Sequence, residues 1–463
     1  MDNSGHTSFN WFVHTKTEVI KLNNILSYKN KNVGVLGVGI SGLAAAKVLL
    51  NSSAKVFVFD DFKEKPPTLL ESNWVNYQKW PWKDLCALVV SPGIPINKNI
   101  KHKAIKLALD HKVKIINDID LFMQSRPKAI IVGITGTNGK STTVALLHHI
   151  LKFNKIKSVI GGNFGYPACE IIDPGNDGVI ILELSSYQLD GASKLTLNLA
   201  SIINITPDHL DYHNNFEEYL SCKLKIVDFL NDNGTIVYNE GDKLLNQLIN
   251  KDKYQLIKIF KTKNISFQDY INDNISLNGK HNQVNASIAI SLAKNLNITD
   301  DKIKLSIKSF KGLPHRMETI YVSEKLKIIN DSKSTNGEST AAALSSFSNI
   351  FWILGGQPKK DGIGAAKKYL NRVEESFVIG ESYNFFANQI STNSKNSRLN
   401  KCITLQDATE LAINKAQKSN LKEIVILLSP SAASFDQFIN FEDRGNKFKE
   451  IVNKQLNEGV LIC

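Results

Sequence analysis

The sequence is poor in the features that mark exported or membrane-bound proteins. Its five cysteines are scattered, with no CxxC and no paired spacing, which argues against a disulfide framework and against structural zinc. No apolar run approaches the ~18 residues of a membrane-spanning helix, and the N-terminus has no apolar segment of signal-peptide length. We therefore expect a cytoplasmic protein in a reducing compartment, neither exported nor inserted in a membrane.

Charge and size narrow the class of protein further. The formal net charge is +12, but lysine is spread over the whole length and forms no single basic face, so we expect no nucleic-acid partner. A polyanionic small-molecule substrate would suit that charge. The 463 residues exceed what one hydrophobic core usually supports, and 42% hydrophobic with 22% charged residues is typical of globular domains. Several domains are expected.

A glycine-rich segment, GITGTNGKST at 133–142, is the strongest chemical signal in the chain. It follows an apolar strand-like run (129–134) and precedes a run with helical apolar spacing (142–152). Such a loop binds nucleotide phosphates with its backbone N–H groups and its lysine, and its serine ligates Mg²⁺. The strict P-loop pattern is not met, because Ile134 stands where its first glycine would be. The predicted phosphate-binding residues are Gly136, Thr137, Asn138, Gly139, Lys140, Ser141 and Thr142.

A second glycine-rich segment, GVGISG at 37–42, also lies between a strand-like and a helix-like run. It matches the G-x-G-x-x-G pattern of dinucleotide-binding folds, and Asp60 ends the next strand, where those folds have the acid that binds the ribose. Taken alone, the pattern favours an NAD-dependent oxidoreductase. The turn itself only places a diphosphate at a helix N-terminus, so other nucleotide diphosphates fit it equally well.

Strand-like and helix-like runs alternate along the chain, which predicts an α/β fold with parallel strands and helical crossovers. We expect an N-terminal extension (1–30) and then three domains: a Rossmann-like domain (31–126), a P-loop-type ATPase domain (127–312) and a second Rossmann-like domain (313–463). The last domain has strand-like runs that each end in a polar or glycine-rich loop, where parallel sheets bind ligands. These runs are 326–331, 351–356, 376–380 and 424–430.

Polar residues cluster where the predicted central strands end. Glu183 lies in the apolar run 179–184, at a position from which a carboxylate can complete an Mg²⁺ shell beside a phosphate loop. After the next strand, the segment 206–213 holds His209 and His213. These histidines could share a helix face, but the HExxH pattern of zinc enzymes is absent, which argues against a zinc site.

Two later motifs suit a nucleotide. Asn282 and Asn285 in HNQVNA share one predicted helical face, where their amides can bind a base edge or a ribose. Arg316 in LPHRME falls at the predicted junction of the second and third domains. A guanidinium at such a junction can reach a phosphate when the domains close.

Together and in this order, these segments resemble the Mur ligase family over residues 31–463. The motifs that carry the resemblance are GTNGKST, LELSSYQL, DHLDYH, HNQVNA, LPHRME, NDSKSTN and SPSAASFDQFINFEDRG. The resemblance implies an ATP-dependent acid–amino-acid ligase of cytoplasmic peptidoglycan precursor synthesis. The last two motifs imply that it adds D-glutamate to UDP-N-acetylmuramoyl-L-alanine (UDP-MurNAc-L-Ala) through an acyl phosphate, with release of ADP and phosphate.

The resemblance also implies the residues of the ATP and metal sites. Lys140 would stabilise the transferring phosphoryl group, while Ser141 and Glu183 would hold the Mg²⁺ of ATP. His209 would help to hold a second Mg²⁺. Lys223 in SCKLKI falls where the family has a lysine that CO₂ converts to a metal-binding carbamate. Further residues implied on the ATP side are Asn282, Asn285, Arg316 and Asp331.

For the other two substrates, the resemblance reassigns the first glycine motif from NAD to the UDP diphosphate. The residues implied for UDP-MurNAc-L-Ala are Ile40, Ser41, Gly42, Asp61, Ser91, Pro92, Gly93, Asn163 and Gln188. Lys333 is implied in catalysis as well as in binding. The ammonium groups of Lys333 and Lys359 suit a dicarboxylate. The residues implied for D-glutamate are Lys333, Thr335, Lys359, Ser434 and Phe441.

Three alternatives stay open on the sequence. A sibling ligase for another amino acid would keep the fold and the mechanism. An NAD-dependent oxidoreductase would leave GTNGKST and the later motifs without a role, and a nucleotide-sensing regulator would bind ATP without turnover. The partners expected are small molecules, and the chain is expected to be a monomer.

Overall fold

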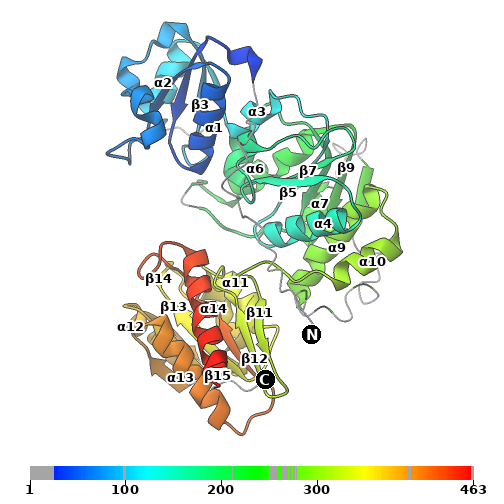
Figure 1. Cartoon of the computed structure of the whole chain (residues 1–463), viewed down its shortest axis with the longest axis vertical. Coiled ribbons are helices and arrows are strands. Elements are labelled where there is room, and N and C mark those ends of the chain that lie inside the picture. The colour runs from blue at the N-terminus through cyan, green and yellow to red at the C-terminus, as the bar shows by residue number, and fades with distance from the viewer. Residues whose placement is uncertain are drawn as a thin grey trace, which may run out of the picture. The chain divides into compact units, whose positions relative to one another are not determined.

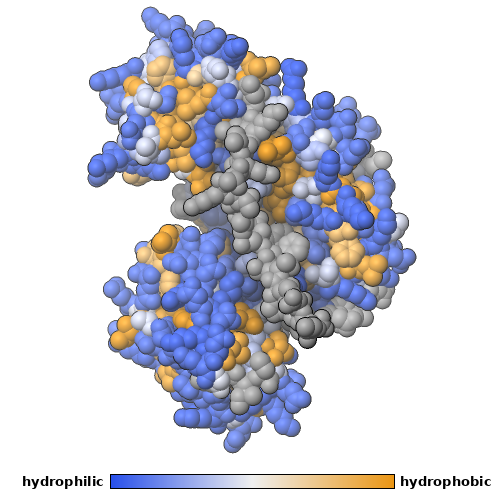
Figure 2. Space-filling view, in the orientation of Figure 1, coloured by the Kyte–Doolittle hydropathy of each residue, from blue (hydrophilic) through white to orange (hydrophobic). Residues whose placement is uncertain are grey.

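The chain divides into two compact units, Met1–Asn264 and Ile265–Cys463 (Figure 1). Within the described residues, no helix is both long enough and apolar enough to cross a membrane. On the face drawn in Figure 2, hydrophilic residues cover most of the surface and apolar residues form smaller patches between them. The computed structural model describes residues 25–96, 101–210, 212–249, 258–261, 270, 274, 277, 279–393 and 398–459.

The first sheet of the first unit has four parallel strands. In spatial order they are β2 (Lys55–Phe59), β1 (Asn32–Leu36), β3 (Leu85–Val90) and β4 (Lys114–Ile116). The helices of this part are η1 (Leu26–Tyr28), α1 (Ile40–Asn51), η2 (Thr68–Asn73), η3 (Tyr77–Lys79), η4 (Trp82–Asp84), α2 (Lys103–Asp110) and α3 (Asp118–Met123). Alternate strand residues pack with α1 and α3 in one core and with α2 in another, so both faces of the sheet are covered.

The residues just before β1 pack with this sheet. Ile25 and Tyr28 are buried in the same core as α1, and the backbone N of Ile25 donates to Oγ of Ser52 (2.8 Å). Of the expected extension 1–30, the part from Ile25 on therefore contributes to the first core. Residues 1–24 lie outside the described residues.

The second sheet of the first unit has six parallel strands. In spatial order they are β10 (Lys258–Lys261), β9 (Leu230–Tyr238), β8 (Leu197–Ile202), β5 (Ile130–Thr135), β7 (Val179–Glu183) and β6 (Ser158–Gly162). Strand β7 is buried along its whole length, which explains its unbroken apolar run. The helices around this sheet are α4 (Lys140–Phe153), η5 (Ala168–Glu170), α5 (Ser186–Gly191), α6 (Phe216–Asp228) and α7 (Lys243–Ile249).

The second unit includes the helices α9 (Lys280–Asn295) and α10 (Asp300–Lys308) and a third sheet. The strands in spatial order are β11 (Glu318–Val322), β12 (Leu326–Asn330), β17 (Ile424–Leu428), β13 (Ile350–Gly355), β15 (Val373–Ile379) and β16 (Arg398–Lys401). All pairs are parallel except β11 with β12. The remaining elements are α11 (Gly337–Leu344), β14 (Gln357–Pro358), η9 (Gly364–Arg372), α12 (Tyr383–Asn393), α13 (Leu405–Lys418), β18 (Ala432–Ala433) and α14 (Phe441–Asn457).

Helices cover both faces of the third sheet. One core joins strand residues to α13 and α14, and the other joins them to α11, η9 and α12 (Figure 1). The α/β class expected from the sequence is confirmed. Helices α9 and α10 belong to the second unit, although the sequence placed residues up to 312 in the central domain. The division into three domains at the expected boundaries stays a prediction.

Candidate active site

The segment 133–142 forms a tight loop between β5 and α4. Gly139, the N-cap of α4, has a φ of 86°, a left-handed conformation that favours glycine. The chain that follows β8 braces this loop, because the backbone N of Thr137 donates to Asn204 O (3.0 Å) and that of Asn138 to Asn204 Oδ1 (2.9 Å). The loop thus holds its backbone at the positive end of the α4 dipole, which suits a phosphate.

Lys140 begins α4, and its side chain folds back over the loop. Its Nζ donates to the backbone oxygens of Gly136 (2.8 Å) and Thr137 (2.9 Å). A phosphate at this loop would offer the ammonium group a charge-assisted partner, which is stronger than a neutral carbonyl. Lys140 can therefore leave these two backbone oxygens and bind a nucleotide phosphate instead.

Ser141 and Glu183 meet at the start of α4 and the end of β7. Ser141 Oγ donates to Glu183 Oε2 (2.6 Å), and Asn163 Nδ2 donates to Glu183 Oε1 (2.8 Å). Both Ser141 and Glu183 are buried. A hydroxyl and a carboxylate beside a phosphate loop are the oxygen donors that Mg²⁺ takes together with nucleotide phosphates, so these two residues fit that ion.

Lys223 in α6 lies directly beneath the phosphate loop. It is 1% exposed, its Nζ donates to Gly136 O (2.9 Å) and to Thr135 Oγ1 (3.5 Å), and it lies 4.8 Å from the centre of the Tyr219 ring. Burial holds the pKa of Lys223 well below its usual value of 10.5, and the neighbouring charge of Lys140 lowers it further. This burial could not be predicted from the sequence, since Lys223 could equally have been a solvated helix residue.

His209 lies in the loop after β8, among aromatic side chains. It has a φ of 53°, and its Nδ1 is 2.7 Å from the hydroxyl of Tyr187. His213 is buried separately, with Nε2 2.9 Å from Ser186 Oγ. Among the described residues, no three His, Cys, Asp or Glu side chains lie close enough together to hold a metal ion. Of the four predicted metal ligands, Ser141 and Glu183 are joined by a hydrogen bond.

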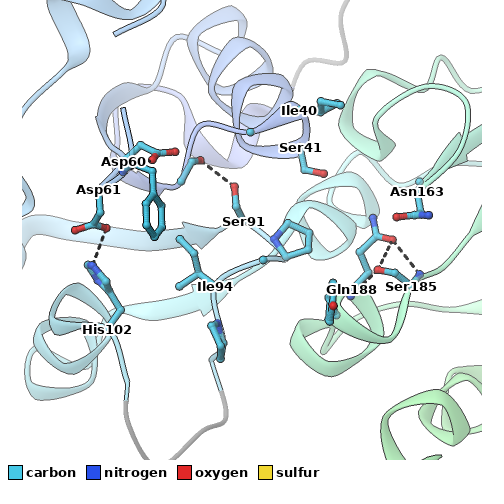
Figure 3. Close-up of a pocket in the computed structure, with 18 of the residues that line it drawn as sticks. Ile40, Ser41, Asp60, Asp61, Ser91, Ile94, His102, Asn163, Ser185 and Gln188 are labelled. Atoms are coloured by element: carbon cyan, nitrogen blue, oxygen red, sulfur yellow. Dashed lines mark hydrogen bonds and ion pairs between the residues drawn. The ribbon is translucent and has the colours of Figure 1, made fainter. Parts of the chain in front are cut away.

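A cavity of about 780 Å³ lies in the first unit, between loops of its two sheets (Figure 3). In Figure 3, Asn163, Ser185 and Gln188 lie on one side of the cavity, and Asp61 and His102 on the other. His102, Tyr187 and Phe62, which is 97% exposed, line it but were not predicted from the sequence. The predicted residues that line it are Ile40, Ser41, Asp61, Ser91, Pro92, Gly93, Asn163 and Gln188.

The motif GVGISG forms the loop between β1 and α1 at this cavity. Gly42 is not in the lining, but a Cβ on it would collide with the carbonyl oxygen of Gly37, so the close turn needs a glycine there. Asp60 does not stand free for a ribose. Its Oδ2 accepts from Val38 N (2.6 Å) and its Oδ1 from Phe62 N (2.9 Å). The acid that favoured NAD therefore braces the glycine loop.

The second unit carries the other residues predicted for ATP. Asn282 and Asn285 are both buried on one face of α9, and Asn285 Nδ2 donates to Asn282 Oδ1 (3.2 Å). Asp331 follows β12, where its side chain accepts from Met317 N (3.2 Å) and Ser429 Oγ (3.0 Å). Burial raises the pKa of Asp331 to about 7, and the charge of Arg316 is among the effects that oppose this.

The residues predicted for D-glutamate lie on loops at the ends of the third sheet's strands and on α14. Lys333 Nζ lies 3.6 Å from the centre of the Phe441 ring, and Ser332 Oγ donates to Phe441 O (2.9 Å). Ser434 is buried, Thr335 is half-buried and Lys359 is exposed. The structure thus brings Lys333 and Phe441 into contact, and Lys359 directly follows β14.

Arg444 connects these loops and was missed in the sequence. It is fully buried in α14, and its guanidinium donates to Ser332 O (2.8 Å), Ala432 O (3.1 Å) and Gly355 O (3.4 Å). Burial lowers the pKa of Arg444 to about 10. Arg444 lies in NFEDRG, and the polar residues around it suggested a loop at a strand end, not a buried guanidinium.

Comparisons with known proteins agree with these features. The model of the Mur ligase middle domain matches residues 134–293, which include the predicted phosphate-binding residues 136–142, Glu183, Lys223 and most of α9. UDP-N-acetylmuramoylalanine--D-glutamate ligase of Zymomonas mobilis is 38% identical over 439 residues, covering 90% of this chain and 96% of the relative. The chain belongs to the Mur ligase family. The same-named ligase of Rhodopseudomonas palustris is 34% identical over 92% of this chain and 97% of its own length.

Solved structures of Mur ligases have the same fold. UDP-N-acetylmuramate-alanine ligase MurC of Thermotoga maritima superposes with a TM-score of 0.56 at 18% identity, covering 92% of this chain and 99% of that chain. MurF ligase of Thermotoga maritima, solved in complex with ADP, has a TM-score of 0.54 at 15% identity over 94% and 98% of the two chains. At these identities the likeness concerns the fold.

Proposed function

We propose that this chain ligates D-glutamate to UDP-MurNAc-L-Ala with ATP, in the cytoplasmic synthesis of peptidoglycan precursors. The observation that carries the proposal is the match to D-glutamate ligases over nine-tenths of the chain, with 38% identity to the Zymomonas mobilis protein. The Ser141–Glu183 pair beside the phosphate loop supports ATP as the second substrate. The hydrogen bonds that Asp60 accepts from Val38 of the glycine loop and from Phe62 argue against the oxidoreductase alternative.

The first step is phosphoryl transfer. A carboxylate oxygen of UDP-MurNAc-L-Ala attacks the γ-phosphorus of ATP, the bond to ADP breaks, and an acyl phosphate forms. Lys140 would leave the carbonyls of Gly136 and Thr137 and stabilise the phosphoryl charge. Ser141 and Glu183 would hold Mg²⁺, which neutralises charge on the phosphate oxygens when bound.

The second step is acyl transfer. The neutral amine of D-glutamate attacks the acyl carbon, and the tetrahedral intermediate expels phosphate as the carbon–oxygen bond breaks. The nitrogen loses one proton, which water or the departing phosphate takes up. Lys333 would take part in this acyl transfer. Together with Lys359 it would also pair with the two carboxylates of D-glutamate. Arg444 donates hydrogen bonds to two of the loops that carry these residues, which supports assigning them to one pocket. The proposed D-glutamate residues are Lys333, Thr335, Lys359, Ser434 and Phe441.

A second Mg²⁺, held by His209 and by a carbamate on Lys223, is part of the proposal. Carbamate formation joins the neutral amine nitrogen to the carbon of CO₂ with loss of one proton. The buried position of Nζ against the loop carbonyl of Gly136 supports the choice of this lysine. On the ATP side we propose Asn282, Asn285, Arg316 and Asp331.

The cavity between the two sheets of the first unit is proposed to bind UDP-MurNAc-L-Ala. The N-terminus of α1, at Ile40 and Ser41, suits its diphosphate. Asp61 and the turn 91–93 would lie near the uracil. Asn163 and Gln188, from the second sheet, would contact the muramoyl portion. A monomer in the cytoplasm, with small-molecule partners and three domains, completes the proposal.

The test is phosphate release from ATP with UDP-MurNAc-L-Ala, comparing D-glutamate with L-glutamate, L-alanine and meso-diaminopimelate and confirming the product mass. Release that needs D-glutamate is expected. Release with another amino acid would point to a sibling ligase and overturn the proposed pocket. Absence of release with all four, together with NAD binding, would restore the oxidoreductase alternative.

A further inference from the structure

A buried carboxyl group that has no role in the proposed mechanism lies behind the cavity wall. Asp118 begins α3, which follows the last strand of the first sheet, and it is 2% exposed. Its Oδ2 accepts a hydrogen bond from Nε2 of Gln188 (3.1 Å), which lies in α5 beside the second sheet. Its Oδ1 has no hydrogen-bond partner among the described residues. Asp118 therefore joins the two sheets at Gln188, a residue that lines the cavity.

The carboxamide of Gln188 is held in one orientation. Its Oε1 accepts from both N and Oγ of Ser185 (3.2 Å each), and its backbone O accepts from Nδ2 of Asn117 (2.8 Å). The backbone N of Ser185 can only donate, and Oδ2 of Asp118 accepts, so both neighbours select the same orientation. In a flipped carboxamide, the donor Nε2 would face the N–H of Ser185, and Oε1 would face the accepting Oδ2 of Asp118. The native orientation leaves one N–H of Nε2 for a cavity ligand.

The carboxyl group holds this orientation whether or not it is protonated. Burial raises the pKa of Asp118, and the hydrogen bond from Gln188 is the largest of the effects that oppose that rise. A proton added to the group would sit on Oδ1, since Oδ2 already accepts from Gln188. The buried N–H of Gln188 therefore keeps its acceptor, and removing that acceptor would leave a buried donor unsatisfied.

We propose that Asp118 is a positioning residue that aims an N–H of Gln188 at the sugar–peptide portion of the UDP-linked substrate. The inference rests on the proposed function, because it assigns a hydrogen-bond donor to that substrate. The sugar and amide oxygens of the substrate accept hydrogen bonds, whereas a flipped Gln188 would present its own oxygen to them. Asp118 thus sets the polarity of this part of the cavity wall together with Ser185.

Asp120 provides a matched control in the same helix. It is also buried, and its carboxylate accepts from N and Oγ of Ser193 (2.8 and 2.9 Å) and from N of Lys194 (2.7 Å). Asp120 therefore ties α3 to the second sheet as Asp118 does, but neither Ser193 nor Lys194 lines the cavity. If Asp118 only held the sheets together, removing either carboxylate would affect substrate binding equally.

The experiment measures the affinity for UDP-MurNAc-L-Ala by calorimetry and the KM and kcat of the ligase, in the full chain. Asp118→Leu is expected to weaken this binding and raise this KM about tenfold, with the KM for ATP unchanged. Asp118→Asn, which keeps an accepting oxygen, should stay within about threefold of the wild type. Asp120→Ala should lower the melting temperature without changing the affinity. Asp118→Ala replaces the leucine variant if that variant does not fold.

A double-mutant cycle with Gln188→Met identifies the path of the effect. The double variant should bind no more weakly than Gln188→Met alone, because Asp118 acts through that carboxamide. Additive losses, or equal losses in the Asp118 and Asp120 variants, would overturn the inference. An unchanged affinity in Asp118→Leu would also overturn it and leave the proposed function intact. A wild-type protein that neither binds nor uses UDP-MurNAc-L-Ala would instead overturn the proposed function.

Discussion

The two glycine-rich loops of the first unit share an architecture and differ in their chemistry. Each joins a buried parallel strand to a helix N-terminus, β1 to α1 and β5 to α4. The loop before α4 has Lys140 on its carbonyls, Ser141 bonded to a buried carboxylate and Lys223 beneath it. The loop before α1 contains no lysine and is held by Asp60. The backbone thus supplies a phosphate site in both, and the side chains decide whether phosphoryl transfer follows.

The largest effect is expected at Lys140, because the loop before α4 has this lysine and the loop before α1 has none. Lys140→Ala should lower phosphate release about 10³-fold, because it removes a cation that stabilises the transferring phosphoryl group. Affinity for UDP-MurNAc-L-Ala, measured by calorimetry, should not change, since that substrate belongs to the other loop. Wild-type turnover in this variant would remove the phosphate-loop assignment.

Lys223 tests what lies beneath the same loop. Lys223→Ala should lose about 10²-fold in kcat, and short-chain carboxylates should restore part of it by replacing the carbamate as metal ligand. Lys225→Ala is the control on the same helix, since Lys225 Nζ bonds to Asp190 (2.9 Å) and not to the loop. An unaffected rate in the Lys223 variant would exclude the carbamate.

At the other loop, the effect should be smaller and limited to one substrate. A Cβ at Gly42 would meet the carbonyl oxygen of Gly37 and Oγ of Ser91, so Gly42→Ala should cost about 1–3 kcal/mol of stability. The KM for UDP-MurNAc-L-Ala should rise, with the KM for ATP unchanged. Gly39→Ala is the stability control, because a Cβ there meets no atom within 4 Å. Equal melting temperatures for both variants would contradict the close-turn argument.

The smallest effect is expected at the acid behind the first loop. Asp60→Asn replaces one accepting oxygen by a donor next to the backbone N of Val38 or Phe62, which should cost about 1–2 kcal/mol. We expect a slightly lower melting temperature and a few-fold higher KM for UDP-MurNAc-L-Ala. NAD should not quench the tryptophan fluorescence of either protein. Quenching that the substitution abolishes would revive the dinucleotide interpretation.

Local patterns predicted both glycine loops and many of the strands. The runs 326–331 and 424–430 fall on β12 and β17, and 179–184 falls on β7, because buried parallel strands are apolar without interruption. The antiparallel strand β11 was not identified. Its residues are only half-buried for the most part, so they lack that continuous apolar signal.

Contacts between distant segments could not be predicted in the same way. Asp118 meets Gln188, and Arg444 meets Ser332, across long stretches of chain, and no local spacing encodes such pairs. The same holds for His102, whose Nε2 lies 2.9 Å from Asp61 Oδ2 at the rim of the cavity. Motif positions therefore gave candidate ligands, whereas the residues that orient them emerged only from the fold.

The most direct test follows oxygen through the reaction. UDP-MurNAc-L-Ala labelled with ¹⁸O in both oxygens of its carboxylate is turned over with ATP and D-glutamate, and the released phosphate is analysed by mass spectrometry. Phosphoryl transfer to the carboxylate predicts one ¹⁸O in each phosphate and the other in the new amide. Unlabelled phosphate would contradict the acyl phosphate, and with it the role given to the loop of Lys140.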